Sequence, residues 1–150
     1  MEIRCAKPDD AETLVRLINV AFQPEKFFIA GDRINLMQLH DFQAKGEFLI
    51  AERVGCVYVE LRGDRCYLGL LAVDPAVQGT GLGRRLMCAA EDRARELGCA
   101  FMDLRVVNLR VELPAFYHHM GYVENGTSEF PAEIPTLQRC HFVHMSKPLR

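Results

Sequence analysis

The stretch that decides the fold runs from Leu70 to Leu97 and begins Leu70-Leu71-Ala72-Val73-Asp74-Pro75-Ala76-Val77-Gln78-Gly79-Thr80-Gly81-Leu82-Gly83-Arg84-Arg85-Leu86. An apolar strand ends at Asp74-Pro75, and a glycine-rich turn follows it. A helix then opens from the turn and ends at Gly98, because apolar side chains recur at helical spacing in Leu82, Leu86, Ala89, Ala90, Ala94 and Leu97. The charged residues of this helix, among them Arg85, Glu91 and Glu96, predict a solvated opposite face.

The turn itself has the chemistry of an anion site. Glycines at 79, 81 and 83 let the backbone bend sharply and approach a ligand closely. The first turn of the following helix leaves free N–H groups, and the helix dipole adds partial positive charge there. Arg84 and Arg85 add charge nearby. These features predict a site for a phosphate or pyrophosphate group.

Two familiar phosphate-binding motifs do not fit this turn. A dinucleotide fingerprint, G-x-G-x-x-G, counted from Gly79 would need glycine at position 84, which is arginine. A P-loop needs Gly-Lys-Ser/Thr, and the sequence has no such triplet. What remains is Gln78-x-x-Gly81-x-Gly83, or a strand–helix turn that binds nothing.

The composition fits one domain, residues 1–150, with an ordinary core. Apolar residues make up 49% of the chain and the formal net charge is −2, which gives no sign of nucleic acid or an anionic membrane as a partner. No apolar run approaches a membrane span, and the N-terminus lacks the apolar core of a signal peptide. The six cysteines form no C-x-x-C pair, so we expect buried, reduced thiols in a cytoplasmic protein.

The remaining chain predicts alternating strands and helices. Strands are expected at 2–5, 48–52, 56–61, 66–73, 100–107, 122–124 and 140–146, with Asn125-Gly126 as a turn and an irregular loop at 127–139. Helices are expected at 10–22, 34–44, 81–97 and, briefly, after Leu113. The three central strands form an antiparallel meander, and 66–107 forms a β–α–β unit with parallel strands.

This order, together with the glycine loop, resembles the GNAT N-acetyltransferase superfamily. Phe116-Tyr117-x-x-Met120-Gly121-Tyr122 is similar to that family's closing motif. The resemblance implies an α/β (α+β) fold: a mixed, mostly antiparallel sheet of six to seven strands, flanking helices and a splayed central β–α–β unit. It also implies acetyl-CoA as the cosubstrate, and an amine acceptor that is either a small molecule or a protein amino group.

The resemblance further implies which residues contact the cofactor. The strand before the loop would contribute its backbone, and the loop and a later segment would complete the site: Leu71, Ala72, Val73, Gln78, Gly79, Thr80, Gly81, Leu82, Gly83, Arg84, Asn108 and Phe116. Asn108 stands nine residues before Tyr117, where the family usually has seven, so the connection here is longer.

Direct acetyl transfer must also move protons. Tyr117 matches the family's general acid, which protonates the leaving thiolate, and the alternative is a half-buried core tyrosine. The resemblance also implies Glu60 as the candidate general base, because family members often carry a catalytic glutamate late in this meander; the alternative is a solvated edge carboxylate, and Asp103 is the weaker candidate.

Other chemistries fit poorly. His118-His119 and His141-x-x-His144 lack the spacing of a metal site, and neither serine lies in a nucleophile elbow. The sequence therefore predicts an N-acetyltransferase with no metal. A non-catalytic acyl-CoA sensor and a plain interaction domain are the alternatives. A homodimer, pairing through the last strand, is left open.

Overall fold

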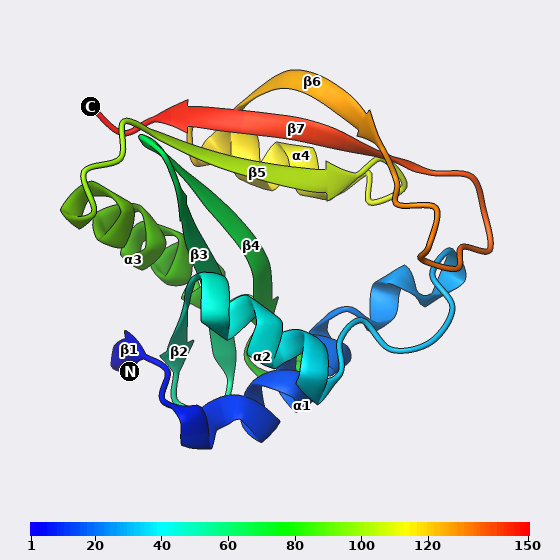
Figure 1. Cartoon of the computed structure of the whole chain (residues 1–150), viewed down its shortest axis with the longest axis horizontal. Coiled ribbons are helices and arrows are strands. Elements are labelled where there is room, and N and C mark those ends of the chain that lie inside the picture. The colour runs from blue at the N-terminus through cyan, green and yellow to red at the C-terminus, as the bar shows by residue number, and fades with distance from the viewer.

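The computed structural model describes residues 1–150 and contains one seven-stranded sheet with the order β1-β2-β3-β4-β5-β7-β6 (Figure 1). The strands are β1 (Ile3–Cys5), β2 (Glu47–Ala51), β3 (Gly55–Arg62), β4 (Arg65–Val73), β5 (Phe101–Val107), β6 (Val123–Glu129) and β7 (His141–Pro148). The helices are α1 (Ala11–Ala21), α2 (Leu36–Lys45), α3 (Leu82–Glu96) and α4 (Leu113–His119), with short 3₁₀ turns η1 (Pro8–Asp10), η2 (Gln23–Phe27) and η3 (Pro75–Val77). The expected mixed sheet with flanking helices is confirmed.

The centre of the sheet is splayed, as the β–α–β unit predicted. Strands β4 and β5 are parallel neighbours, but they pair only from Arg65 to Tyr67 and from Phe101 to Asp103. Beyond that point they diverge, as Figure 1 shows. Leu70 lies in the diverging half with φ +50°, and the register of β3 against β4 shifts there. A non-glycine residue in this left-handed region marks a bulge that bends β4 away from β5.

Two apolar clusters pack on opposite faces of the sheet. One holds α3 and α4 against β2 to β5, and the other holds α1 and α2 against β2 to β4. Side chains of β4 pack into both clusters, because successive residues of a strand point to opposite faces of the sheet. The expected apolar stripe of α3 is confirmed for its buried members Leu82, Leu86, Ala90 and Ala94.

The expectation that Glu91 is solvated was wrong. This residue is 3% exposed and packs toward the C-terminal strands. Its carboxylate accepts hydrogen bonds from the Tyr122 hydroxyl and from Lys147 Nζ, both at 2.9 Å. These two partners satisfy a charge that would otherwise be costly to bury, and they fix α3 to β7.

Three further expectations need correction. Asn125-Gly126 does not end a strand: both residues lie within β6, where the register shifts between Glu124 and Gly126. The last strand, β7, is paired on both sides, so it offers no edge to a second subunit. Not all cysteines are buried, because Cys5 and Cys88 are exposed. No helix has both the length and the apolar character that crossing a membrane requires.

Candidate active site

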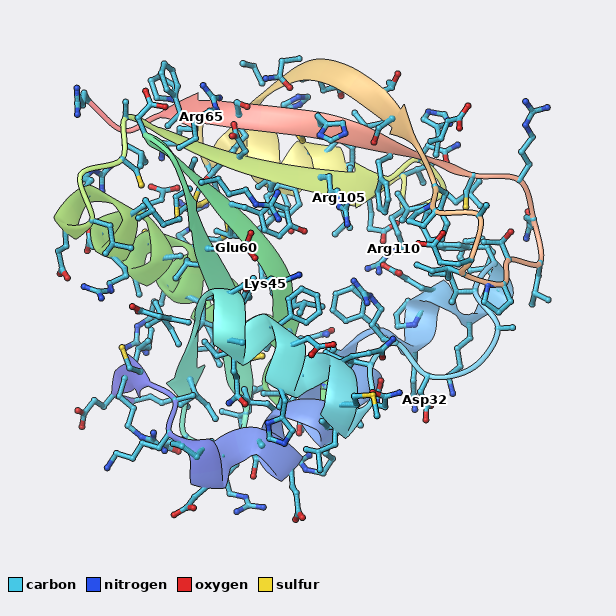
Figure 2. All side chains as sticks on the ribbon, in the orientation of Figure 1. Asp32, Lys45, Glu60, Arg65, Arg105 and Arg110 are labelled. Carbon is cyan, nitrogen blue, oxygen red and sulfur yellow. The ribbon has the colours of Figure 1, made fainter.

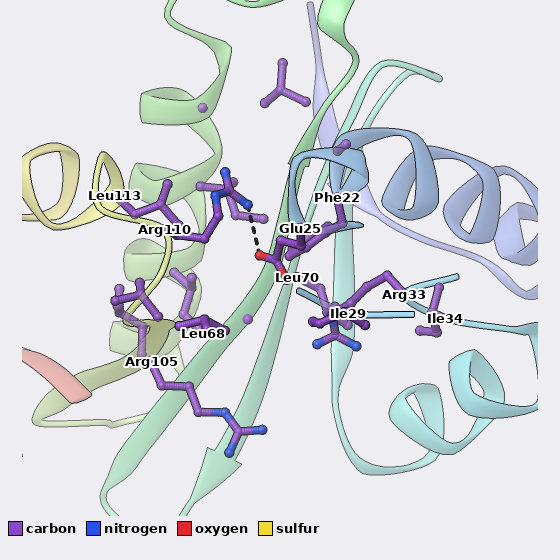
Figure 3. A pocket seen from close by; sticks show the side chains of 18 of the residues that line it. Phe22, Glu25, Ile29, Arg33, Ile34, Leu68, Leu70, Arg105, Arg110 and Leu113 are labelled. Atoms are coloured by element: carbon purple, nitrogen blue, oxygen red, sulfur yellow. Dashed lines mark hydrogen bonds and ion pairs between the residues drawn. The ribbon is translucent and has the colours of Figure 1, made fainter. Parts of the chain in front are cut away.

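A cavity of about 910 Å³ occupies the region where β4 and β5 diverge. Its walls come from parts of the chain that are distant in sequence (Figure 3). One end is lined by the glycine loop at the start of α3, and the middle by the separated halves of β4 and β5. The far end is lined by residues around η2 and by the closing segment, residues 130–140 between β6 and β7. The splay therefore opens a continuous space through the sheet.

The glycine loop presents a row of unpaired backbone donors. The N–H groups of residues 79–84 have no hydrogen-bond acceptor in the protein, whereas Gln78 N donates to Pro75 O and Arg85 N donates to Gly81 O. Gly79 and Gly81 have φ of +81° and +84°, which favours glycine. Arg84 lines the cavity beside them. Six neighbouring donors at a helix N-terminus form a place where a phosphate or pyrophosphate group can bind.

The wall next to the loop is an unpaired edge of β4. Asp74 N donates to Val54 O on the β3 side, so strand alternation turns the N–H of Val73 toward the opening. Leu71 and Val73 both line the cavity. Because β5 has already diverged here, the N–H of Val73 is available to an extended ligand that lies between the two strands, whereas the Val73 carbonyl accepts a hydrogen bond from Gln78 Nε2 at 3.4 Å.

Tyr117 projects from α4 into the same cavity. Its side chain is 7% exposed, and its hydroxyl makes no hydrogen bond to the protein, although no buried polar side-chain atom is left unsatisfied. The hydroxyl therefore keeps contact with the cavity. Burial raises the pKa of Tyr117 to about 12, and the positive charge of Arg110 opposes this rise. The phenol is protonated at neutral pH and can donate its proton.

A buried ion pair stands across the cavity from the loop. Arg110 Nη1 donates to Glu25 Oε2 at 2.9 Å, and the two side chains are 14% and 8% exposed (Figure 3). Burial raises the pKa of Glu25, and the charges of Arg110 and Arg33 offset this only in part. Arg110 also binds Glu112. The pair joins η2 to the segment after β5.

The closing segment is tied directly to the η2 region and forms a roof over this end. Ile29 and Thr136 form an antiparallel bridge, Ala30 N donates to Pro135 O at 3.3 Å, and Leu137 N donates to Phe28 O at 2.7 Å. Figure 1 shows the segment reaching down to η2. An apolar cluster that includes Phe28, Val107 and Phe142 packs beneath it.

Most of the residues expected at the site are brought together. Leu71, Val73, Gln78, Gly79, Gly81, Leu82, Gly83, Arg84, Phe116 and Tyr117 all line the cavity. Ala72, Thr80 and Asn108 do not. Ala72 is buried toward α1, the Thr80 hydroxyl donates to Val77 O, and Asn108 Oδ1 accepts from His141 N at 2.8 Å. Asn108 therefore anchors the start of β7.

Glu60 lies on β3 (Figure 2) and is not among the residues that line the cavity. Its carboxylate accepts hydrogen bonds from the Tyr58 hydroxyl at 2.8 Å and from Arg62 Nε at 2.6 Å. Burial alone would raise the pKa of Glu60, but these bonds outweigh it and the pKa lies below its usual value. Its position and low basicity both argue against direct proton removal from an acceptor in the cavity. Asp103 is likewise held by Arg65 and Ser146.

The sequence reasoning missed several charged residues that line the cavity, among them Glu25, Arg33, Arg105 and Arg110. They come from η2, from the segment before α2, from β5 and from the turn before α4. No motif or periodicity joins them, because only the tertiary fold brings Glu25 and Arg110 together across 85 positions. Pro24 lies at the start of η2, the short turn in which Glu25 is the buried residue.

Comparisons with known proteins agree with this architecture. The family model described as an acetyltransferase (GNAT) domain matches residues 44–124. Blasticidin-S acetyltransferase of Streptomyces morookaense is 42% identical over 114 residues, which cover 73% of this chain and 82% of that protein. The ribosomal-protein-S18-alanine N-acetyltransferase of Escherichia coli has a TM-score of 0.76 at 20% identity, over 99% of this chain and 93% of that one. The yncA structure from Salmonella typhimurium, with its cofactor acetyl-CoA, has a TM-score of 0.75 at 20% identity, over 100% and 94%. The family model spans more than half of the sequence, and the chain belongs to the GNAT family of acetyl-CoA-dependent N-acetyltransferases.

Proposed function

We propose that this enzyme transfers the acetyl group of acetyl-CoA to the primary amine of a small molecule, by direct attack within a ternary complex. The observation that carries the proposal is the continuity of one cavity. It runs from the unpaired N–H groups of residues 79–84, past the free edge of β4, to the Tyr117 hydroxyl and on to Glu25. Donor and acceptor can therefore meet where the strands diverge.

The proposed roles at the donor end follow from the groups that are free. The N–H groups of residues 79–84 and the Arg84 guanidinium hold the pyrophosphate. The backbone of Leu71 and Val73 orients the pantetheine arm, and one of its N–H groups stabilises the charge that develops on the thioester oxygen. Such a donor is worth about 3 kcal/mol in other enzymes. Phe116 packs beside Gly83 at this end.

Tyr117 is proposed as the general acid. As the amine nitrogen bonds to the carbonyl carbon and the carbon–sulfur bond breaks, the phenol gives its proton to the leaving sulfur, and the proton that the nitrogen loses on becoming an amide restores the phenol. Of the charged groups that act on Tyr117, Arg110 favours the phenolate and Glu25 opposes it. The acceptor must first lose a proton, which costs roughly 4–5 kcal/mol for an unperturbed lysine-like amine at pH 7. Glu25 is the carboxylate we assign to that task, since it lines the cavity and its pKa is raised.

A small acceptor is supported by the roof. A polypeptide acceptor needs an open groove for the residues that follow its amine. Here the closing segment and the η2 region cross the far end and are joined by backbone hydrogen bonds. The similarity to a blasticidin-S acetyltransferase supports the same class of acceptor. We also propose that the 150 residues act as one domain in the cytoplasm, where six unpaired thiols stay reduced.

The test is release of free thiol from acetyl-CoA in the presence of small primary amines, with blasticidin S first, and of peptides with a free amino terminus. The proposal predicts turnover with a small amine and none with the peptides. Faster acetylation of the peptides would contradict it. Binding of acetyl-CoA with no turnover on any amine would favour a sensor instead.

A further inference from the structure

Two arginines line the far end of the cavity without a partner. Arg33 precedes α2 and Arg105 lies on β5, so they reach the cavity from opposite walls (Figure 3). Neither guanidinium forms an ion pair or a hydrogen bond with any protein group. Arg110 differs from both, because it forms ion pairs with Glu25 and Glu112. The far end therefore holds two guanidinium groups that no carboxylate contacts directly, and the negative charge of Glu25 acts on Arg33 without a hydrogen bond between them.

Aromatic rings hold both side chains in place. The Arg33 guanidinium carbon lies 5.4 Å from the centroid of Phe22, and that of Arg105 lies 4.1 Å from the centroid of Phe142. A guanidinium that stacks on a ring keeps its N–H edge free for planar, bidentate recognition of an anion. Their fixed positions lower the entropic cost of binding such a group.

These arginines serve the acceptor and not the phosphates of coenzyme A. Leu104 and Val106 pack in the cluster that contains α3, so Arg105 between them points to the opposite face of the sheet. The glycine loop opens α3, and its own cation is Arg84. Burial lowers the pKa of Arg33, and the positive charge of Arg105 lowers it further, whereas the negative charge of Glu25 raises it. Arg33 and Arg105 therefore repel each other at the same end of the cavity.

We propose that Arg33 and Arg105 form an anion-binding subsite, and that the acceptor is a small primary amine that also carries a carboxylate or phosphate group. The inference rests on the proposed function, because it assumes that the amine is acetylated in this cavity. Two carboxylates, Asp32 and Glu133, also line this end, but neither pairs with Arg33 or Arg105. The anionic group would anchor between the two arginines, and the amine would face Tyr117 and Glu25.

Two measurements test the subsite. The first titrates acetate and inorganic phosphate into the protein saturated with coenzyme A, by calorimetry, for wild type, the double variant Arg33→Gln/Arg105→Gln and the control Arg139→Gln. Arg139 is an exposed arginine of the closing segment that does not line the cavity. We expect one of the two anions to bind wild type and Arg139→Gln, and at least tenfold weaker binding to the double variant. Equal binding to all three proteins would overturn the subsite.

The second measurement compares kcat/KM for amine pairs that differ in one anionic group: amino acids against their amides, and O-phosphoethanolamine against ethanolamine. The subsite predicts that the anionic member reacts at least tenfold faster in wild type and that the double variant loses this preference. The pair that shows the preference identifies carboxylate or phosphate. A neutral member that reacts equally well would contradict the inference while leaving the proposed function intact. Failure of coenzyme A to bind at all would instead reject the proposed function.

Discussion

Tyr117 carries the most specific residue-scale claim, because its hydroxyl is proposed to protonate the leaving sulfur. Tyr117→Phe removes only that hydroxyl, which has no hydrogen-bond partner in the protein, so the fold should be unaffected. We expect kcat to fall by about 100- to 10,000-fold, as for the loss of a general acid, with unchanged binding of acetyl-CoA. Single-turnover kinetics and calorimetry measure the two quantities. If Tyr117→Phe keeps the kcat of the wild type, Tyr117 is a core tyrosine and not the general acid.

Gly63 has a positive φ, as Gly81 does, and serves as a control position for substitution. Gly81 and Gly63 have φ of +84° and +68°, and a Cβ at either position would meet nothing within 4 Å. Alanine at each should therefore cost a similar strain of about 1 kcal/mol in the free energy of unfolding. Only Gly81→Ala disturbs the loop donors, so it alone should weaken acetyl-CoA binding, by roughly tenfold. Equal weakening by Gly63→Ala would mean that the loss comes from general destabilisation.

Elements are held together by buried polar contacts as well as by the apolar clusters, and Glu91 is the clearest case. Glu91→Ala leaves Lys147 and Tyr122 without their partner, so we expect a loss of about 3–5 kcal/mol in the free energy of unfolding. Glu96, on the same helix, has a side chain that is 65% exposed, and Glu96→Ala should change stability by about 0.5 kcal/mol or less. Urea unfolding measures both. Similar costs for the two variants would show that the buried network contributes little.

Strand β1 and helix α1 are joined by Asp10, whose carboxylate accepts hydrogen bonds from Arg4 and from Lys7 N. The Arg4 bond, followed by the Lys7 bond, lowers the pKa of Asp10 from 3.8 to about 2. The unfolded chain therefore binds more protons between these values, and the contribution to stability is present above pH 3.8 and lost as the pH falls toward 2. Arg4 is partly exposed, so we expect about 1 kcal/mol. Asp10→Asn should destabilise at pH 7 but hardly at pH 2; an equal effect at both would contradict the pKa shift.

Elements formed by local patterns could be predicted from the sequence, and elements formed by distant contacts could not. The strand, loop and helix from Leu70 to Leu97 follow from residues that are adjacent in the chain. Asn125-Gly126 is typical of a turn, but here β6 absorbs the two residues in a register shift and continues to pair with β7 beyond Gly126. Glu91 looked solvated because its partners Tyr122 and Lys147 lie 31 and 56 positions away.

The candidate site also has one end that local motifs predicted and one end that only distant contacts form. Its donor end was predicted, since the glycine loop and Tyr117 belong to short motifs. Its far end was not, because Glu25, Arg33 and Arg105 meet only once the sheet has splayed and the closing segment has crossed η2. Glu60 was predicted because family members often carry a glutamate late in this meander. The resemblance could not reveal that the Tyr58 hydroxyl and Arg62 Nε donate hydrogen bonds to its carboxylate.

At the scale of the whole molecule, the splayed sheet is the feature on which the proposed function depends. The bulge at Leu70 separates β4 from β5. We propose that the gap admits donor and acceptor from opposite ends, and that α3 and α4 supply the phosphate cradle and the acid. Binding of acetyl-CoA across this gap should stabilise the folded molecule as a whole.

The most direct test of this account is therefore the thermal midpoint of wild type with and without acetyl-CoA. A ligand that binds only the folded state, at 100 times its dissociation constant, adds about 2.7 kcal/mol of stability. The account predicts a clear rise in the midpoint for wild type and Gly63→Ala, and a smaller rise for Gly81→Ala at the same ligand concentration. No rise in wild type at saturating acetyl-CoA would contradict the central claim that the loop of residues 79–84 and the gap between β4 and β5 hold the acetyl donor.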